Sequence, residues 1–219
     1  MEKREIYLLS PRHYEGVRLL PMIDFEPMVE SIDFGDADTL LFTSKQAVVT
    51  AEAIDPSWKR LPAIVVGSAT KAEVEGLGGT VIHTPKSHYG EVLAEDILQH
   101  FSDRKILFLR PEKVAFDFKA YIEKHRNNEG ELPVVFEEEI TYRTVCKYYP
   151  PVEQPEKGAI IIFTSPSTIS CFLKSFHWDE GYTAVVIGKT TLEKLSPEME
   201  AVVAEEATIL SCIEKAKSL

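Results

Sequence analysis

The sequence predicts an α/β protein that contains two copies of one parallel-sheet unit. Segments 40–48 and 161–169 share a design: an apolar run, then Phe-Thr-Ser, then an amphipathic stretch, at an offset of 163 − 42 = 121 residues. The next pair of similar segments, around Gly67 and Gly188, keeps that offset, because 188 − 67 is again 121. Two matches at one offset indicate an internal duplication.

Strand and helix patterns alternate from residue 39 onwards. Continuous apolar runs predict buried strands at 39–43, 63–67, 80–83, 105–110, 134–139, 159–163, 183–187 and 201–203. Apolar residues at helical spacing predict a helix that begins near Ser44 and others at 70–77, 89–101, 113–125, 167–176, 190–196 and 208–217. This alternation is typical of parallel sheets that are covered by helices on both faces.

The C-terminal half of the pattern lacks opening strands, and two N-terminal apolar runs, 5–10 and 17–21, are the simplest source of them. We therefore expect a discontinuous domain into which a second domain is inserted. The expected boundaries are residues 1–25 plus 145–219 for the first α/β domain, 26–144 for the inserted α/β domain, and 22–28 and 140–150 for the two chain crossings.

Two N-terminal segments depart from a regular pattern. Segment 11–16 is about half the length that a parallel crossover needs, so either a helix has been lost or the two strands meet in another way. Segment 21–27 is bounded by prolines, and we expect an extended connector rather than a strand or helix.

Composition excludes several classes of partner. The net charge is 24 − 35 = −11, and no long block of Lys or Arg is present, which argues against nucleic acid or an anionic membrane as the main partner. No apolar run reaches membrane-spanning length. The cysteines, Cys146, Cys171 and Cys212, are scattered, so we expect buried thiols in a reducing cytoplasm.

Polar residues follow the predicted strands at the points where ligands bind in open parallel sheets. Hydroxyl groups and free backbone N–H groups at helix starts can hold carboxylates or phosphates. The alternative for any single Ser or Thr is that it only caps its helix. The candidate binding residues are Thr43, Ser44, Lys45, Gly67, Ser68, Thr70, Arg110, Ser165, Ser167, Lys189, Thr190 and Thr191.

Other motifs carry little chemistry. The glycines form no dinucleotide fingerprint, and no Walker lysine pattern or nucleophile triad is present. The histidines His83, His88 and His100 lack a metal-ligand spacing and are expected to be surface or loop residues, so no metal or other cofactor is predicted. Residues 137–139, three glutamates, are expected to form a solvated strand end.

Six motifs in order give the chain a resemblance to the uroporphyrinogen-III synthase family over nearly its whole length. They are Leu-Phe-Thr-Ser-Lys-Gln-Ala-Val (41–48), Val-Val-Gly-Ser-Ala-Thr (65–70), Ile-Leu-Phe-Leu-Arg (106–110), Ile-Thr-Tyr-Arg-Thr (140–144), Ile-Phe-Thr-Ser-Pro-Ser (162–167) and Ile-Gly-Lys-Thr-Thr (187–191). The resemblance implies two flavodoxin-like parallel-sheet domains joined by a two-stranded linker. It also implies a cofactor-free lyase of tetrapyrrole (haem) biosynthesis. Such a lyase closes hydroxymethylbilane and inverts ring D, by dehydration to an azafulvene and then a spiro intermediate.

The resemblance assigns roles to single residues. Tyr142 matches the family's most telling side chain, and its implied role is to assist loss of the terminal hydroxyl group as water. Spacing alone favours a different reading of Tyr142, as a linker tyrosine packed between domains. Thr190 or Thr191 matches the family threonine that holds a substrate carboxylate, while Arg110, Arg143, Lys45 and Lys189 are expected to supply local positive charge.

The expected partner is a small linear tetrapyrrole. A transient contact with the preceding enzyme, hydroxymethylbilane synthase, is also expected, and the protein itself is expected to be a monomer. The alternative function is a non-catalytic two-domain binder of a small polyanionic ligand. A binder has no need of a tyrosine at the position of Tyr142, and this feature separates the two hypotheses. A response-regulator-like module lacks the required cluster of Asp residues.

Overall fold

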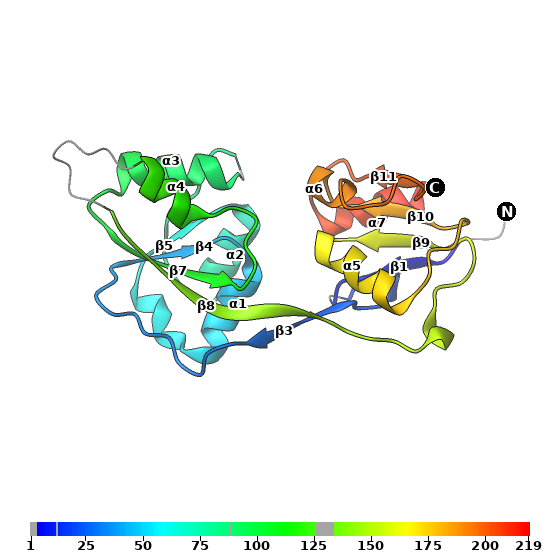
Figure 1. Ribbon diagram of the computed structural model, residues 1–219, viewed down its shortest axis with the longest axis horizontal. Helices are drawn as coiled ribbons and strands as arrows, with labels where there is room; N and C mark the ends of the chain where they lie inside the picture. Colours follow the sequence, from blue (N-terminus) through cyan, green and yellow to red (C-terminus); the bar gives the residue numbers. More distant parts are fainter. Residues whose placement is uncertain (1–3, 12, 88, 126–133) are drawn as a thin grey trace. The chain divides into compact units, whose positions relative to one another are not determined.

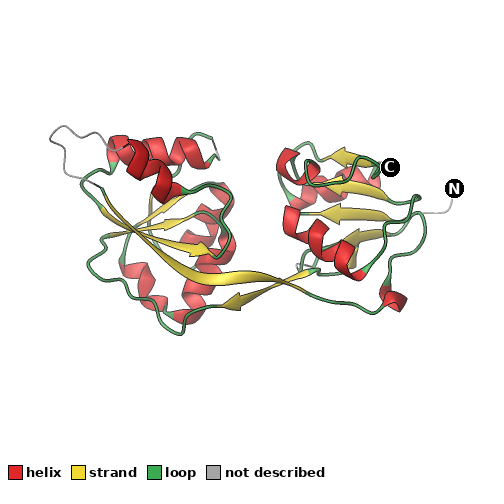
Figure 2. Ribbon diagram, in the orientation of Figure 1, coloured by secondary structure: helices red, strands yellow, loops and turns green. Residues whose placement is uncertain are grey.

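A computed structural model of the protein describes residues 4–11, 13–87, 89–125 and 134–219. The chain divides into two compact units: unit 1 comprises Met1–Phe25 and Thr144–Leu219, and unit 2 comprises Glu26–Arg143. Each unit is a sheet with helices on both faces (Figures 1 and 2). The α/β class with parallel sheets is therefore confirmed.

Unit 1 holds a five-stranded sheet in the order β11-β10-β9-β1-β2, and its pairs are parallel. In chain order this is 2-1-3-4-5, the flavodoxin-like arrangement. Its strands are β1 (Ile6–Leu8), β2 (Arg18–Leu19), β9 (Ile160–Phe163), β10 (Thr183–Val186) and β11 (Ala201–Val203). Its helices are α5 (Pro166–Ser175), α6 (Lys189–Leu192), α7 (Ile209–Lys217) and the short 3-10 turn η2 (Pro151–Glu153).

Both faces of the unit 1 sheet are buried, as the continuous apolar strands predict. Alternate residues of a strand point to opposite faces, so Ile6 and Leu8 pack with α7 while Tyr7 and Leu9 pack with α5. The same alternation separates the residues of β9. Because the sheet is covered twice, it leaves only its edges and its strand ends for ligands.

Unit 2 repeats the arrangement with a different chain order. Its sheet runs β3-β8-β7-β4-β5-β6. If β7 is matched to β1 and β8 to β2, then β4, β5 and β6 fall in the places of β9, β10 and β11. The strands are β3 (Ile23–Pro27), β4 (Thr39–Phe42), β5 (Ala63–Val65), β6 (Val81–His83), β7 (Lys105–Pro111) and β8 (Val135–Cys146). The helices are α1 (Lys45–Ile54), η1 (Pro56–Arg60), α2 (Ser68–Gly76), α3 (Gly90–His100) and α4 (Phe118–His125).

Helix ends in unit 2 follow local chemistry. Helix α2 ends before Gly78, whose φ of +89° is the left-handed conformation that terminates helices at low cost. Helix α4 begins at Phe118 rather than at residue 113, because the Asp117 carboxylate accepts a hydrogen bond from the Ala120 N–H (2.9 Å) and fixes the first turn there. Helix α6, in unit 1, likewise ends at Leu192, earlier than predicted.

The expectation that segment 21–27 is an extended connector rather than a strand is wrong. Ile23–Pro27 form β3, which lies beside β8 in the sheet. The Met28 N–H donates to Thr141 O and the Lys147 N–H to Met22 O, both at 2.9 Å, in an antiparallel register. Strand β8 extends to Cys146, as the alternation of residues 140–147 predicts, and its length offers backbone groups that require partners.

The connection between β1 and β2 carries no helix in its described residues. The two strands pair directly in parallel, with Tyr7 opposite Arg18. Gly16 has a φ of +77°, which turns the chain back toward β2. Tyr14 and Val17 pack against the hydrophobic cluster that contains residues of β1, β9 and α7. This loop therefore covers the part of the sheet that a crossover helix would otherwise cover.

The cysteine prediction is wrong for two of the three residues. Cys146, at the end of β8, forms a disulfide with Cys171 of α5, since their Cα atoms are 5.2 Å apart. Cys212 remains free and buried, and burial raises the pKa of its thiol to about 11.

Within the described part of the chain, no helix combines the length and the apolar character that a bilayer crossing needs.

We predict that reduction of the disulfide lowers the free energy of unfolding of the protein. The bond closes a loop with a sequence separation of 25 residues, and loop-closure entropy of that size is worth about 3 kcal/mol. Urea unfolding with and without reductant measures the difference. A Cys146→Ser/Cys171→Ser variant is the control and should not respond to reductant. Equal unfolding midpoints for the unsubstituted protein under both conditions would contradict the prediction.

Candidate active site

Tyr142 and Ser44 form a hydrogen-bonded pair at the carboxyl end of the unit 2 sheet. Tyr142 Oη lies 2.9 Å from Ser44 Oγ. Tyr142 belongs to β8, whereas Ser44 follows β4, and β7 lies between these two strands. The phenol therefore reaches past the end of one strand to meet the beginning of α1. The two residues are 98 positions apart in the chain, so only the fold brings them together.

The beginning of α1 fixes the position of Ser44. Ser44 is the N-cap residue, in extended conformation, and its Oγ accepts a hydrogen bond from the Ala47 N–H (3.0 Å). This bond satisfies one of the backbone donors that a helix start leaves without a partner. Ser44 therefore caps α1 and contacts Tyr142 with the same oxygen atom.

Tyr142 is held in a buried environment. The residue is only 4% exposed, and the Glu112 N–H donates to its backbone carbonyl (2.8 Å). Burial raises the pKa of the Tyr142 phenol, and the hydrogen bond with Ser44 lowers it in part. The phenol consequently keeps its proton at neutral pH and can donate it.

The loop after β5 gives a second group of donors in unit 2. Gly67 is the N-cap of α2 and provides no side chain for capping, so the N–H groups of the first turn are left to ligand or water. Ser68 is exposed beside it, whereas Thr70 is 4% exposed and faces the interior. Thr43, at the end of β4, is half-buried.

Unit 1 presents the corresponding loops at the carboxyl end of its own sheet. Ser165 caps α5 in a reciprocal arrangement with Thr168, and Ser167 is exposed in the first turn. Gly188 precedes α6 as Gly67 precedes α2. Thr190 is exposed there, but Thr191 is 3% exposed. Of the two threonines, Thr190 is the one that solvent or a ligand can reach.

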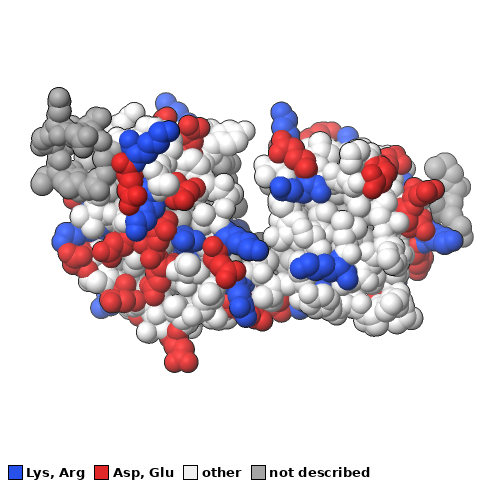
Figure 3. Space-filling model, viewed as in Figure 1, with Lys and Arg blue, Asp and Glu red and all other residues white. Residues whose placement is uncertain are grey.

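The expected local positive charge is largely neutralised. Arg110 contacts Glu138 (3.1 Å), Lys45 contacts Glu73 (2.9 Å), and Arg143 contacts Glu26 (2.7 Å). The Arg110 side chain is only 17% exposed, so its guanidinium charge interacts with the Glu138 carboxylate rather than with solvent. Lys189 is exposed and has no ion-pair partner among the residues that the structure describes. On the face seen in Figure 3, acidic and basic side chains are interspersed.

Of the glutamates at 137–139, which the sequence predicts to be solvated, Glu137 is exposed as predicted, whereas Glu138 and Glu139 are half-buried. Glu138 is engaged by Arg110. Burial raises the pKa of Glu139, whose Oε2 atom is buried and has no hydrogen-bond partner among the residues that the structure describes. The long β8 strand accounts for the difference, because its neighbours β3 and β7 cover residues that a free strand end would expose. Of the three histidines, His83 pairs with Asp96 (2.7 Å), and His88 lies outside the described residues.

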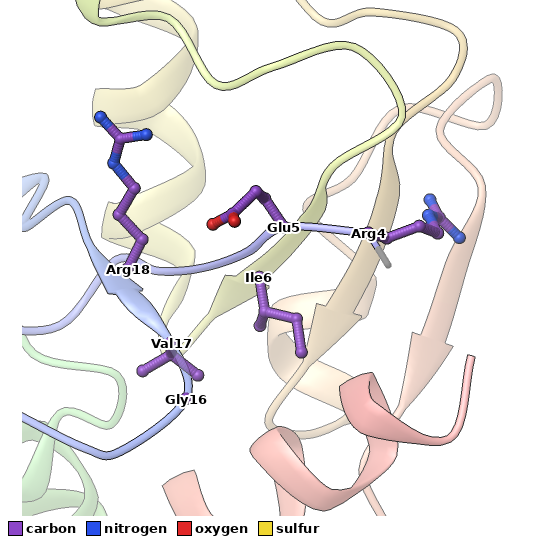
Figure 4. A pocket seen from close by; sticks show the side chains of 6 residues that line it. All are labelled: Arg4, Glu5, Ile6, Gly16, Val17 and Arg18. Atoms are coloured by element: carbon purple, nitrogen blue, oxygen red, sulfur yellow. The ribbon is translucent and has the colours of Figure 1, made fainter. Parts of the chain in front are cut away.

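A pocket of about 490 Å³ lies at the amino-terminal end of the unit 1 sheet, where β1 and β2 begin (Figure 4). Its arginines are already engaged. Arg4 donates to Gly158 O (2.6 Å) and to Thr183 Oγ1 (2.9 Å), and Arg18 donates to Tyr7 Oη (3.2 Å). Ligands of open parallel sheets bind at the carboxyl ends of strands, so this pocket is not assigned to the active site. Its lining comprises Arg4, Glu5, Ile6, Gly16, Val17 and Arg18.

The chain is similar to known proteins over nearly its whole length. Residues 15–214 match the family described as uroporphyrinogen-III synthase HemD. The fold is similar to uroporphyrinogen-III synthetase from Helicobacter pylori, with 23% identity, a TM-score of 0.77, and 98% and 99% of the two chains covered. It is also similar to a mutant uroporphyrinogen III synthase from the extremely thermophilic bacterium Thermus thermophilus, with 9% identity, a TM-score of 0.57, and 98% of each chain covered.

No curated protein matches the sequence. Nothing in these comparisons supports the alternative of a non-catalytic binder. The family match covers most of the chain, and the family's activity is that of a cyclising hydro-lyase in porphyrin and haem biosynthesis. The chain belongs to the uroporphyrinogen-III synthase family and is a uroporphyrinogen-III synthase.

Proposed function

We propose that Tyr142 supplies the proton that hydroxymethylbilane needs to lose its terminal hydroxyl group. The hydrogen bond between Tyr142 and Ser44 is the observation that carries this proposal. It holds a protonated phenol at the strand ends, where the fold class binds its ligands.

Loss of the hydroxyl group is the step at which an acid helps most. Hydroxide is a poor leaving group, and a proton delivered as the carbon–oxygen bond breaks converts it to water. The resulting azafulvene is then attacked by ring D through its substituted carbon, which gives the spiro intermediate. That second stage asks the protein mainly to hold the bilane in the productive conformation.

We propose further that the hydroxyl and amide groups at the strand ends hold the substrate's acetate and propionate groups. Ser68, the N–H groups that follow Gly67, and Thr190 are accessible and suit carboxylates. Arg110 and Lys45 contribute less charge than the sequence suggested, because each is paired with a glutamate. The full proposed set is Thr43, Ser44, Lys45, Gly67, Ser68, Arg110, Ser165, Ser167, Lys189 and Thr190; Thr70 and Thr191 are buried and are left out.

The direct test of the proposed function supplies hydroxymethylbilane to the purified protein and separates the porphyrin isomers after oxidation. Isomer III is the expected product. Isomer I alone, which is the product of spontaneous closure, would refute the function.

We predict that Tyr142→Phe lowers turnover by about 10²–10⁴-fold, the usual contribution of a positioned acid. The substitution keeps the ring and removes one hydrogen bond, so the free energy of unfolding should fall by only about 1 kcal/mol. Initial rates and urea unfolding measure the two effects. An unchanged rate together with a clear loss of stability would mean that Tyr142 is a packing residue.

We predict that Thr190→Val raises the KM for hydroxymethylbilane several-fold and changes kcat little. A carboxylate far from the reacting carbon is held equally in the ground state and the transition state, so losing its contact affects binding alone. Ser170→Ala is a matched control, since Ser170 is exposed on α5 and its hydroxyl bonds back to Pro166 O. A fall in kcat at constant KM would contradict the assignment of Thr190.

We propose that the protein acts as a monomer in the cytoplasm and meets hydroxymethylbilane synthase transiently. The substrate closes spontaneously to the wrong isomer, which favours an enzyme in the compartment where the bilane is made. The Cys146–Cys171 disulfide is the observation against a permanently reducing location. Alkylation of thiols in acid-quenched cells gives the disulfide state, and sedimentation gives the oligomeric state.

A further inference from the structure

We propose that Ser44 is the group that meets the leaving hydroxyl, and that Tyr142 delivers its proton through Ser44. The two side chains would then form a relay, with Ser44 as its outer member and Tyr142 as its proton source. This inference rests on the proposed function and specifies how the acid reaches the substrate. Capping and substrate binding, the roles already given to Ser44, require neither a phenol nor a proton transfer.

Exposure separates the two members of the pair. Tyr142 is 4% exposed, whereas Ser44 is half-buried and can be reached from solvent. The two oxygen atoms are 2.9 Å apart, a distance that suits proton transfer between them. A substrate at the strand ends therefore encounters the Ser44 hydroxyl more readily than the phenol.

The hydrogen bonds around Ser44 give the relay its direction. A serine hydroxyl has one hydrogen and two acceptor sites. The Ala47 N–H occupies one acceptor site of Ser44 Oγ (3.0 Å). Either oxygen of the Ser44–Tyr142 bond can be the donor, and the relay assigns the donation to Tyr142 because a phenol is a far stronger acid than an alcohol. The hydrogen of Ser44 is then left to donate outward, toward the leaving group.

The helix start supports the charge that develops. When the relay operates, the hydrogen of Ser44 passes to the substrate hydroxyl oxygen, and the phenolic hydrogen of Tyr142 passes to Ser44 Oγ. The carbon–oxygen bond breaks with its electron pair on oxygen, so water leaves and an azafulvenium cation and a phenolate remain. The positive end of the α1 dipole stabilises this anion. The proton that the rearranged tetrapyrrole loses on regaining aromaticity restores the phenol.

Substitutions at both positions test the relay by their coupling. Ser44→Gly removes the hydroxyl but keeps a residue type that caps helices well, and Ser44→Thr keeps both hydroxyl and cap. These variants, Tyr142→Phe and the Ser44→Gly/Tyr142→Phe double variant are assayed with hydroxymethylbilane for kcat and KM. Thr208→Ala, which removes the side-chain cap of α7, controls for loss of a helix cap and should leave kcat unchanged.

The relay predicts that Ser44→Gly and Tyr142→Phe each lower kcat by about 10²–10⁴-fold and to a similar extent, with little change in KM. The kcat of the double variant should lie within about threefold of the kcat of either single variant, because the effects of substituting residues that act as a unit are not additive. Ser44→Thr should retain most of the activity. A raised KM without a change in kcat in Ser44→Gly, or rate effects that multiply in the double variant, would overturn the relay.

Failure of the relay and failure of the proposed function have different signatures. If the unsubstituted protein yields isomer I alone, the function itself is wrong. If it yields isomer III and the two substitutions act independently, Tyr142 and Ser44 have separate roles and only the relay is wrong.

Discussion

A single hydroxyl group joins the start of α1 to the buried phenol on β8, and the candidate active site depends on this junction. Ser44 must lie in extended conformation to cap the helix, and the same conformation presents its oxygen to Tyr142. The parallel sheet imposes the location, because every β-strand that leads into a helix does so at the carboxyl edge. Backbone donors and capping hydroxyls therefore lie at the same edge of the unit 2 sheet as the buried phenol of Tyr142.

The internal duplication has a structural counterpart in the strand orders of the two sheets. Unit 1 opens with β1 and β2 and continues with β9 after the insertion, whereas unit 2 reaches the corresponding places with β7 and β8 only at its end. The two units thus share one spatial order of strands, but the chain begins each unit at a different strand of that order. Equivalent turns, Phe-Thr-Ser before α1 and before α5, consequently occupy equivalent strand ends.

The protein handles a polyanionic substrate while carrying a net charge of −11. Its arginines and lysines near the strand ends are mostly neutralised by carboxylates, as with Arg110 and Glu138. The binding that we propose, by hydroxyl and backbone N–H groups, fits this charge, since such groups hold a carboxylate without the cost of burying an unpaired cation. Neutral donors also suit a reaction whose intermediate is a cation.

Local patterns in the sequence determined the alternation of strands and helices, the offset of 121 residues, the capping role of Ser44 and the motifs of the family. These depend on neighbouring residues and on periodicity, which a sequence displays directly. Tertiary structure alone decided the β3 strand, the Cys146–Cys171 disulfide, the neutralisation of Arg110 and the contact of Tyr142 with Ser44. Each of these contacts joins groups that are distant in the chain. Local sequence preferences do not determine which partner a strand edge, a thiol, a cation or a phenol will contact.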